Sequence, residues 1–253
     1  MTQLKIINSI VKGAEILKHL SGGVERVSDL SSQLHISKST IHRLLKTLEV
    51  SQLVMQDPLT RRYYLGSLIP ELASKSTTAH KTLTTCSFEE MAFLRDLTKE
   101  TVTIQIRYGL ERICLEEVQS LENIRYVTGK GFVTQIYTGS AGKVLLSELD
   151  DNELELLLKH IRLVPIGPNT ITDKRLLLKE LKKVRAQGYA TSFGERVPGS
   201  ASLSVPIKHY ICPVALNVLG PDNRFSADRM MDALKDVKGA ALRVSKKLKG
   251  GKG

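Results

Sequence analysis

The sequence predicts an α+β protein with two domains, and three observations support this prediction. The chain has 253 residues, which fits two modest domains better than one. Apolar residues recur at helical spacing in three short segments before residue 50, and two short β-prone runs follow them. From Thr101 onward the apolar period changes to two, and a helical block then separates the strand runs. This order is typical of an antiparallel sheet flanked by helices.

The composition is that of a soluble globular protein. Apolar residues make up 42% and charged residues 25% of the chain, which excludes disordered and collagen-like proteins. The sequence has no run of about 18 apolar residues and no secretory signal pattern. We therefore predict a cytoplasmic protein without a membrane partner. Cys86, Cys114 and Cys212 are odd in number and form no CxxC pair, so reduced thiols are expected rather than a disulfide framework or a zinc site.

The net charge of +11 is unevenly distributed along the chain. Residues 235–253 hold seven Lys and Arg against one Asp, which is +6 of the total. Their Gly/Lys end predicts a flexible basic tail over residues 250–253. Because more than half of the excess lies in this one segment, bulk charge does not by itself indicate nucleic-acid binding.

The first fifty residues predict three helices. The first carries Ile10, Ala14, Leu17 and Leu20 at helical spacing and ends at the flexible SGG of residues 21–23. The second has an apolar stripe of Val27, Leu30 and Leu34, and Ser37 is predicted to cap the third. The core face of the third helix consists of Ile41, Leu44, Leu45 and Leu48. The residues that point outward are Lys38, Ser39, Thr40, His42, Arg43 and Lys46.

Two short helices joined by a tight turn, with a supporting helix before them, form a helix-turn-helix whose second member enters the DNA major groove. On that helix Arg43 and Lys46 can contact phosphates or guanine edges. The alternative is an ordinary amphipathic helix with a basic solvent face. The next segment favours the first interpretation, because residues 53–56 and 62–65 flank a turn at Asp57-Pro58 and predict a hairpin, or wing. Arg61 and Arg62 near its tip suit a backbone or minor-groove contact.

Three stretches, SIVKGAEILKHL, VSDLSSQLHISKSTIHRLLKTLE and DPLTRRYYLG, resemble the N-terminal domain of IclR-type bacterial transcriptional regulators. The resemblance implies a winged-helix DNA-binding head in residues 1–68. The helical pattern interrupted by Ser and Thr that follows the wing predicts a linker helix in residues 69–84. It also implies a protein that binds double-stranded operator DNA as a homodimer or tetramer.

The remainder of the chain predicts the second domain. A helix is expected over residues 88–100, followed by an antiparallel meander of strands over residues 101–108, 111–118 and 124–127. The helical block comprises residues 140–149, 150–161 and 172–189, the last capped by Thr172 and stopped at Gly188. Strands over residues 200–207 and 211–221 and a long amphipathic helix over residues 226–248 complete the pattern.

The resemblance extends over this half through GSAGKVLLSEL, TITDKRLLLKELKKVRAQGYA, ERVPG and PVALNVLGP. It implies a GAF-like effector-binding domain over residues 85–249, with a small-molecule pocket between the sheet and the loops. The positions that it implies for the pocket are Ser140, Ala141, Ser192, Ser202, Asn217 and Leu219. Family members that bind small oxoacids usually carry more hydroxyl groups there. Because Phe193, Leu219, Phe132 or Tyr137 could add apolar surface, we hypothesise an aromatic or partly apolar effector.

The sequence does not favour catalysis, a cofactor or a metal. TGSAGKV matches a P-loop only in its final GK, and no GxSxG, HExxH or GxGxxG motif occurs. The six histidines have no metal-ligand spacing. Glu195 is the one acid whose loop context suggests a role, and orienting its loop is the simpler one. Two alternatives remain open: a small-molecule enzyme with an accessory winged helix, and a non-specific DNA-binding protein driven by the basic tail.

Overall fold

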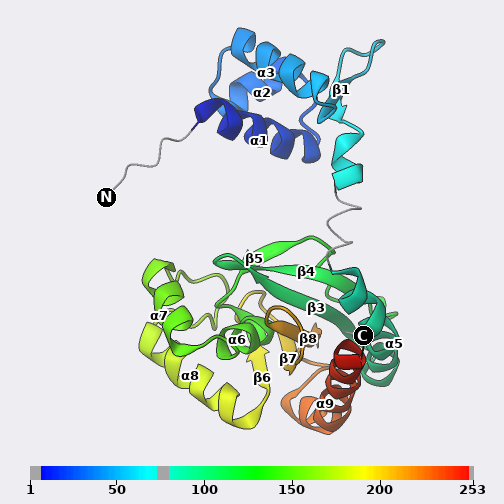
Figure 1. Ribbon diagram of the computed structural model, residues 1–253, viewed down its shortest axis with the longest axis vertical. Helices are drawn as coiled ribbons and strands as arrows, with labels where there is room; N and C mark the ends of the chain where they lie inside the picture. The colour runs from blue at the N-terminus through cyan, green and yellow to red at the C-terminus, as the bar shows by residue number, and fades with distance from the viewer. Residues whose placement is uncertain (1–6, 73–79, 251–253) are drawn as a thin grey trace. The chain divides into compact units, whose positions relative to one another are not determined.

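The computed structural model describes residues 7–72 and 80–250. The chain divides into two compact units, Met1–Ala79 and His80–Gly253, and each is described by itself (Figure 1). Of the predicted linker helix over residues 69–84, residues 73–79 lie outside the described residues, and residues 68–72 are helical. Within the described ranges, no helix is long and apolar enough to cross a membrane.

Three helices and a hairpin form the first unit: α1 (Asn8–Ser21), α2 (Val27–Leu34), α3 (Lys38–Val50), β1 (Val54–Gln56) and β2 (Tyr63–Leu65). Ser37 caps α3 as predicted, because its hydroxyl oxygen accepts from the Thr40 amide at 3.3 Å. The two strands pair antiparallel, which confirms the predicted wing. A Cβ atom at Gly66 would lie 2.1 Å from the Gln52 carbonyl oxygen, so the chain leaving the wing has no room for a side chain there.

The core of the first unit lies where α1, α2, α3 and the wing meet. Its buried members are Ile16, Leu20, Leu30, Ile41, Leu45, Val54 and Tyr63. The predicted stripe of α1 is wrong at Ile10, which is 67% exposed, while Ile16 is fully buried. The reason is rotation of the helix, since its packed face runs through Gly13, Ile16 and Leu20.

A six-stranded antiparallel sheet with the order β5-β4-β3-β8-β7-β6 organises the second unit. Its strands are β3 (Thr101–Tyr108), β4 (Glu111–Val118), β5 (Val133–Gln135), β6 (Ala190–Phe193), β7 (Ser200–Ile207) and β8 (Val214–Pro221). The strand predicted over residues 124–127 is wrong. That segment is a loop whose Tyr126 carbonyl accepts from the Thr101 hydroxyl, and β5 takes the edge position beside β4 instead.

Helices cover the two faces of this sheet (Figure 1). Helices α5 (Lys81–Thr98) and α9 (Ala227–Gly250) pack on one face, and α6 (Gly139–Ser147) packs on the other with α8 (Lys174–Gln187) against it. Helix α7 (Asp151–His160) contributes to the α6–α8 cluster. Asp173 caps α8 in place of the predicted Thr172, because its carboxylate accepts from the Arg175 and Leu176 amides.

Two predicted boundaries of the second domain shift in the structure. Leu83 of α5 is fully buried in the core of the second unit, so residues 81–84 belong to this domain rather than to the linker. At the other end α9 continues through Gly250, and Leu248 is buried in the same core. Of the predicted tail over residues 250–253, only Gly250 is described, and it is helical.

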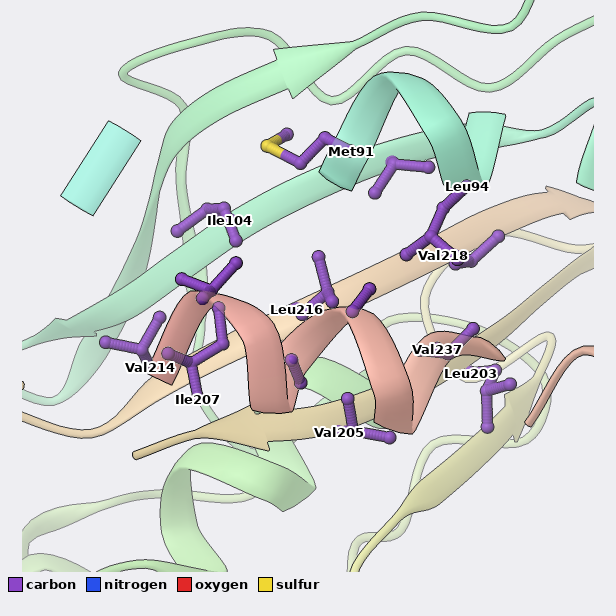
Figure 2. Packing of buried hydrophobic residues seen from close by; sticks show 14 of the residues in the cluster. Met91, Leu94, Ile104, Leu203, Val205, Ile207, Val214, Leu216, Val218 and Val237 are labelled. Carbon is purple, nitrogen blue, oxygen red and sulfur yellow. The ribbon is translucent and has the colours of Figure 1, made fainter. Parts of the chain in front are cut away.

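Strand alternation divides the sheet into an apolar face and a polar face. Figure 2 shows Leu203 and Val205 of β7 and Leu216 of β8 around α9, with Met91 and Leu94 of α5 in the same cluster. The intervening residues of β7, Ser202 and Ser204, are on the opposite face and contact α6. The strands that build the core therefore also present hydroxyl groups toward the N-terminus of α6.

We predict that Leu45→Ala destabilises the first unit by about 2–5 kcal/mol, because it leaves a cavity at a fully buried position of α3. Val50→Ala on the same helix is the matched control, since Val50 is 87% exposed. Urea unfolding of the full chain followed by circular dichroism would measure both changes. Equal stability of the two variants would contradict the assigned core face.

Candidate functional site

The outer face of α3 presents the predicted DNA-contacting side chains. Ser39, His42, Arg43 and Lys46 are exposed, as is Lys38, and Thr40 is half-buried. Lys46 is partly engaged, because its ammonium group lies 2.7 Å from the Glu49 carboxylate and this hydrogen bond raises the pKa of Lys46. Within the described residues, the Arg43 and Lys38 side chains make no hydrogen bond or ion pair, so they are the available cations of this face.

The wing arginines differ in their surroundings. The Arg62 guanidinium donates to the Glu25 carboxylate at 2.9 Å, and this hydrogen bond raises the pKa of Arg62. Arg61 is exposed and adopts a left-handed conformation with φ of 59°. Arg62 thus fixes the wing to the segment before α2, and Arg61 is the arginine that extends from it. This difference between the two arginines could not be predicted from the sequence, because Glu25 lies 37 residues away from Arg62.

In the second unit a cavity of about 60 Å³ lies between the polar face of the sheet and the N-terminus of α6. The loops around Tyr126 and Arg196 close its sides. Its lining comprises Gln105, Arg112, Tyr126, Val127, Thr128, Thr134, Gly139, Ser140, Ala141, Ser192, Arg196, Val197, Ser200, Ala201, Ser202, Asn217 and Leu219.

The structure brings together six of the seven predicted effector-site residues. Ser140, Ala141, Ser192, Ser202, Asn217 and Leu219 all line the cavity, and their contact with an effector stays a prediction. Phe193 is a correction, because it follows Ser192 on β6 and strand alternation turns it away from the lining. Phe132 and Tyr137 do not line the cavity either. The Tyr137 hydroxyl donates to the Val164 carbonyl, and Phe132 is largely exposed.

Hydroxyl and amide groups form a hydrogen-bond network at the base of the cavity. The Ser140 hydroxyl lies 2.7 Å from that of Ser202 and 2.8 Å from that of Ser204. It also donates to the Asn217 Oδ1 atom at 3.1 Å, and the Asn217 amide donates to the Thr103 hydroxyl. Satisfied buried networks of this kind fix the orientation of their members. Ser204 and Thr103 were not predicted, and the site carries more hydroxyl groups than the sequence suggested.

Glu195 connects the loop between β6 and β7 to α6. One carboxylate oxygen accepts from the Gly139 amide at 2.8 Å, and the other lies 2.6 Å from the Lys143 ammonium group. The Glu195 and Lys143 side chains are both buried. The Lys143 ammonium group also pairs with the Glu180 carboxylate at 3.5 Å. A negative charge at a helix N-terminus is favourable, and the side chain of the N-cap Thr138 makes no capping bond. Glu195 therefore positions its loop, and Lys143 is held by carboxylates.

Two arginines that were not predicted also line the cavity. Arg112 of β4 is 7% exposed and donates to the Thr138 carbonyl, and burial lowers its pKa to about 10 with the nearby charge of Arg196 adding to the effect. Burial also lowers the pKa of Arg196, whose guanidinium lies 5.4 Å from the centre of the Phe132 ring. Among the described residues, neither arginine pairs with a carboxylate. The sequence carried no signal for Arg112, because it alternates with Ile113 and Leu115 of the apolar face and so occupies an ordinary polar position of the strand.

Comparison with known families identifies both units. Residues 9–58 match the IclR helix-turn-helix domain, and residues 76–246 match the bacterial transcriptional regulator IclR C-terminal domain. The chain belongs to the IclR family. The HTH-type transcriptional regulator KipR of Bacillus subtilis is 30% identical to it over 227 residues, covering 88% of this chain and 89% of KipR. The HTH-type transcriptional repressor AllR of Salmonella typhi is 30% identical over 248 residues, covering 96% and 91% of the two chains.

A solved structure supports the same assignment. The crystal structure of the Thermotoga maritima IclR matches with a TM-score of 0.77 and 26% identity, over 96% of this chain and 99% of that one. The predicted α+β fold and the family are thereby confirmed. This IclR chain is a transcriptional regulator with a helix-turn-helix DNA-binding domain and a C-terminal effector-binding domain, and its family is regulatory rather than enzymatic.

We predict that Lys143→Met destabilises the second unit by about 3–5 kcal/mol, because it leaves the Glu195 carboxylate buried without its cation. The double variant Lys143→Met/Glu195→Gln should lose less than the sum of the two single variants, since it removes both charges. Urea unfolding of the full chain would measure the cycle. If the loss of unfolding free energy in the double variant equalled the sum of the losses in the two single variants, the Lys143 and Glu195 side chains would not be coupled.

Proposed function

We propose that this IclR regulator binds operator DNA through α3 and the wing, and that a small polar molecule in the cavity of the second unit controls that binding. The observation that carries the proposal is the cavity itself, which is lined by a buried polar network and by six of the residues that the family resemblance implied. Cavities with a few convergent polar groups are the usual sites for small ligands.

The lining favours a small polar effector over the aromatic or partly apolar one suggested by the sequence. Its one aromatic side chain is Tyr126, whose hydroxyl donates to the Pro198 carbonyl. A cavity of about 60 Å³ is also much smaller than the roughly 150 Å³ of an engineered apolar cavity that binds benzene. Both features favour a compound of few non-hydrogen atoms with several hydrogen-bonding groups.

Effector control requires that the molecule bind the operator-bound and free forms of the protein with different affinity, because equal affinity shifts no equilibrium. Each chain has one recognition helix, so an operator with two half-sites requires at least two chains. We therefore propose that the protein binds its operator as a homodimer or tetramer. Two heads on one face of the duplex would read half-sites about 34 Å apart, one helical turn.

A non-specific protein driven by its basic end is disfavoured by the packing of α9. Lys247 pairs with Glu89 of α5 at 3.1 Å, and Leu248 is buried in the core. Much of the basic end thus belongs to a packed helix. The enzyme alternative is disfavoured by the regulatory family to which the chain belongs.

We predict that Arg43→Ala weakens operator binding about ten- to hundredfold, because Arg43 is an available cation on the outer face of α3. Lys18→Ala is the control, since it removes one exposed positive charge from the supporting helix α1 and leaves α3 unchanged. Gel retardation with the intergenic DNA upstream of the gene would measure both. If the Arg43→Ala and Lys18→Ala variants bound the operator with equal affinity, the assignment of α3 as the recognition helix would be wrong.

The wing makes a separate prediction about salt dependence. Arg61→Ala should weaken binding to all sequences similarly and reduce the slope of log affinity against log salt by about one, as expected for a lost phosphate contact. Lys18→Ala serves again as the control, because it removes one exposed positive charge outside the wing. Anisotropy titrations at four salt concentrations would give the slopes. An unchanged slope for Arg61→Ala would exclude a phosphate contact there.

A further inference from the structure

We propose that Glu25 and Glu49 limit the affinity of the protein for DNA, because each neutralises a cation of α3 or the wing that would otherwise bind a phosphate. The inference rests on the proposed binding of operator DNA through these two elements. It adds two residues that determine how strongly the first unit binds DNA and how steeply that binding depends on salt.

The first observation is that two of the five cations presented by α3 and the wing are already paired. The Arg62 guanidinium lies 2.9 Å from the Glu25 carboxylate, and the Lys46 ammonium group lies 2.7 Å from the Glu49 carboxylate. The three cations that form no ion pair among the described residues are Lys38, Arg43 and Arg61. The surface therefore offers DNA three free positive charges instead of five.

The second observation is that stability of the fold does not account for the two carboxylates. The four side chains of these pairs are between 27% and 51% exposed, and ion pairs this exposed add little to stability. Neither Glu25 nor Glu49 is the N-cap or C-cap residue of a helix. At a DNA-binding surface a carboxylate opposes binding, because it repels phosphates and occupies a cation that would otherwise displace a counterion.

The Glu25 carboxylate is kept beside Arg62 by further contacts with β2. The Glu25 carbonyl accepts from the Tyr63 amide at 2.9 Å, which fixes the main chain of Glu25 to the wing. The Tyr64 hydroxyl donates to the carboxylate oxygen that also accepts from Arg62, at 3.5 Å. Because the main-chain hydrogen bond does not need the charge, Glu25→Gln should remove the charge and leave the wing attached.

The pair on α3 is local. Lys46 and Glu49 are three residues apart, a spacing that places two side chains next to each other on a helix. Lys46 belongs to the outward face of α3, so the paired ammonium group lies among the predicted DNA contacts. Removing the Glu49 carboxylate should therefore release a cation on this face without altering the core of the first unit.

Masking the two cations keeps DNA binding moderate. Each cation that binds a phosphate adds about 0.9 to the slope of log affinity against log salt, whatever the DNA sequence. Two more such contacts would tighten the binding of the operator and of all other DNA. An effector that changes operator affinity by about 5- to 150-fold releases the operator only when the affinity before its binding is moderate.

The test measures DNA binding by the full chain and its Glu25→Gln and Glu49→Gln variants. Anisotropy titrations at four salt concentrations would use a fragment of the intergenic DNA upstream of the gene and a scrambled duplex of equal length. Each variant should bind both duplexes about three- to tenfold more tightly at low salt and should steepen the salt slope by about one. Unfolding curves would verify that each variant is folded.

Glu15→Gln is the matched control, because it removes the same charge from α1, where Glu15 forms no ion pair among the described residues. It releases no cation, so its salt slope should equal that of the wild type. A second control compares Glu25→Gln/Arg62→Gln with Arg62→Gln alone. In the absence of Arg62, Glu25→Gln should leave the slope unchanged, which separates release of a cation from a general loss of negative charge.

Two results would overturn the proposal: a slope of either Glu25→Gln or Glu49→Gln equal to that of Glu15→Gln, or a steeper slope for Glu25→Gln that persists without Arg62. The proposed function has its own readout, which is the difference in wild-type affinity between the two duplexes. Equal affinity for both would reject sequence-specific operator binding. The slopes on the scrambled duplex would still decide whether the carboxylates mask the two cations.

Discussion

The buried carboxylate of Glu195 joins the two parts of the second unit that enclose its cavity. It accepts from the first amide of α6 and pairs with Lys143 one turn further along the helix. Because Glu195 lies in the loop between β6 and β7, this interaction holds the loop, and with it Arg196, beside the N-terminus of α6. This buried ion pair therefore fixes one wall of the cavity relative to the other, together with the hydrogen bonds that Thr170 and Tyr126 donate to the Glu195 and Pro198 carbonyls.

The opposite wall depends on the hydrophobic core. In β7 and β8, residues that pack against α5 and α9 (Figure 2) alternate with residues that face α6. Leu203 and Val218 are fully buried in the core, and Ser202 and Asn217 beside them line the cavity. A side chain of the site cannot shift along its strand without moving a core residue as well. Strands fixed in this way hold polar groups in a defined arrangement without a ligand.

Sequence reasoning succeeded where the structure is determined locally. The apolar spacing of α3, its Ser37 cap and the Asp57-Pro58 turn involve residues within a few positions of each other, and all three features are present. It failed where contacts are distant in sequence. The pairs Arg62–Glu25 and Lys143–Glu195 span 37 and 52 residues, and no periodicity reveals them. Phe193 was misplaced because β6 has four residues, too few for alternation to be recognised.

Effector control is a claim about coupling between two binding events, and reciprocity tests it directly. The measurement is the dissociation constant of the effector for the full chain, with and without saturating operator, together with that of the operator, with and without saturating effector. The account predicts that both constants change by the same factor, on the order of 5- to 150-fold. An effector that binds the free and the operator-bound protein with equal affinity would contradict it.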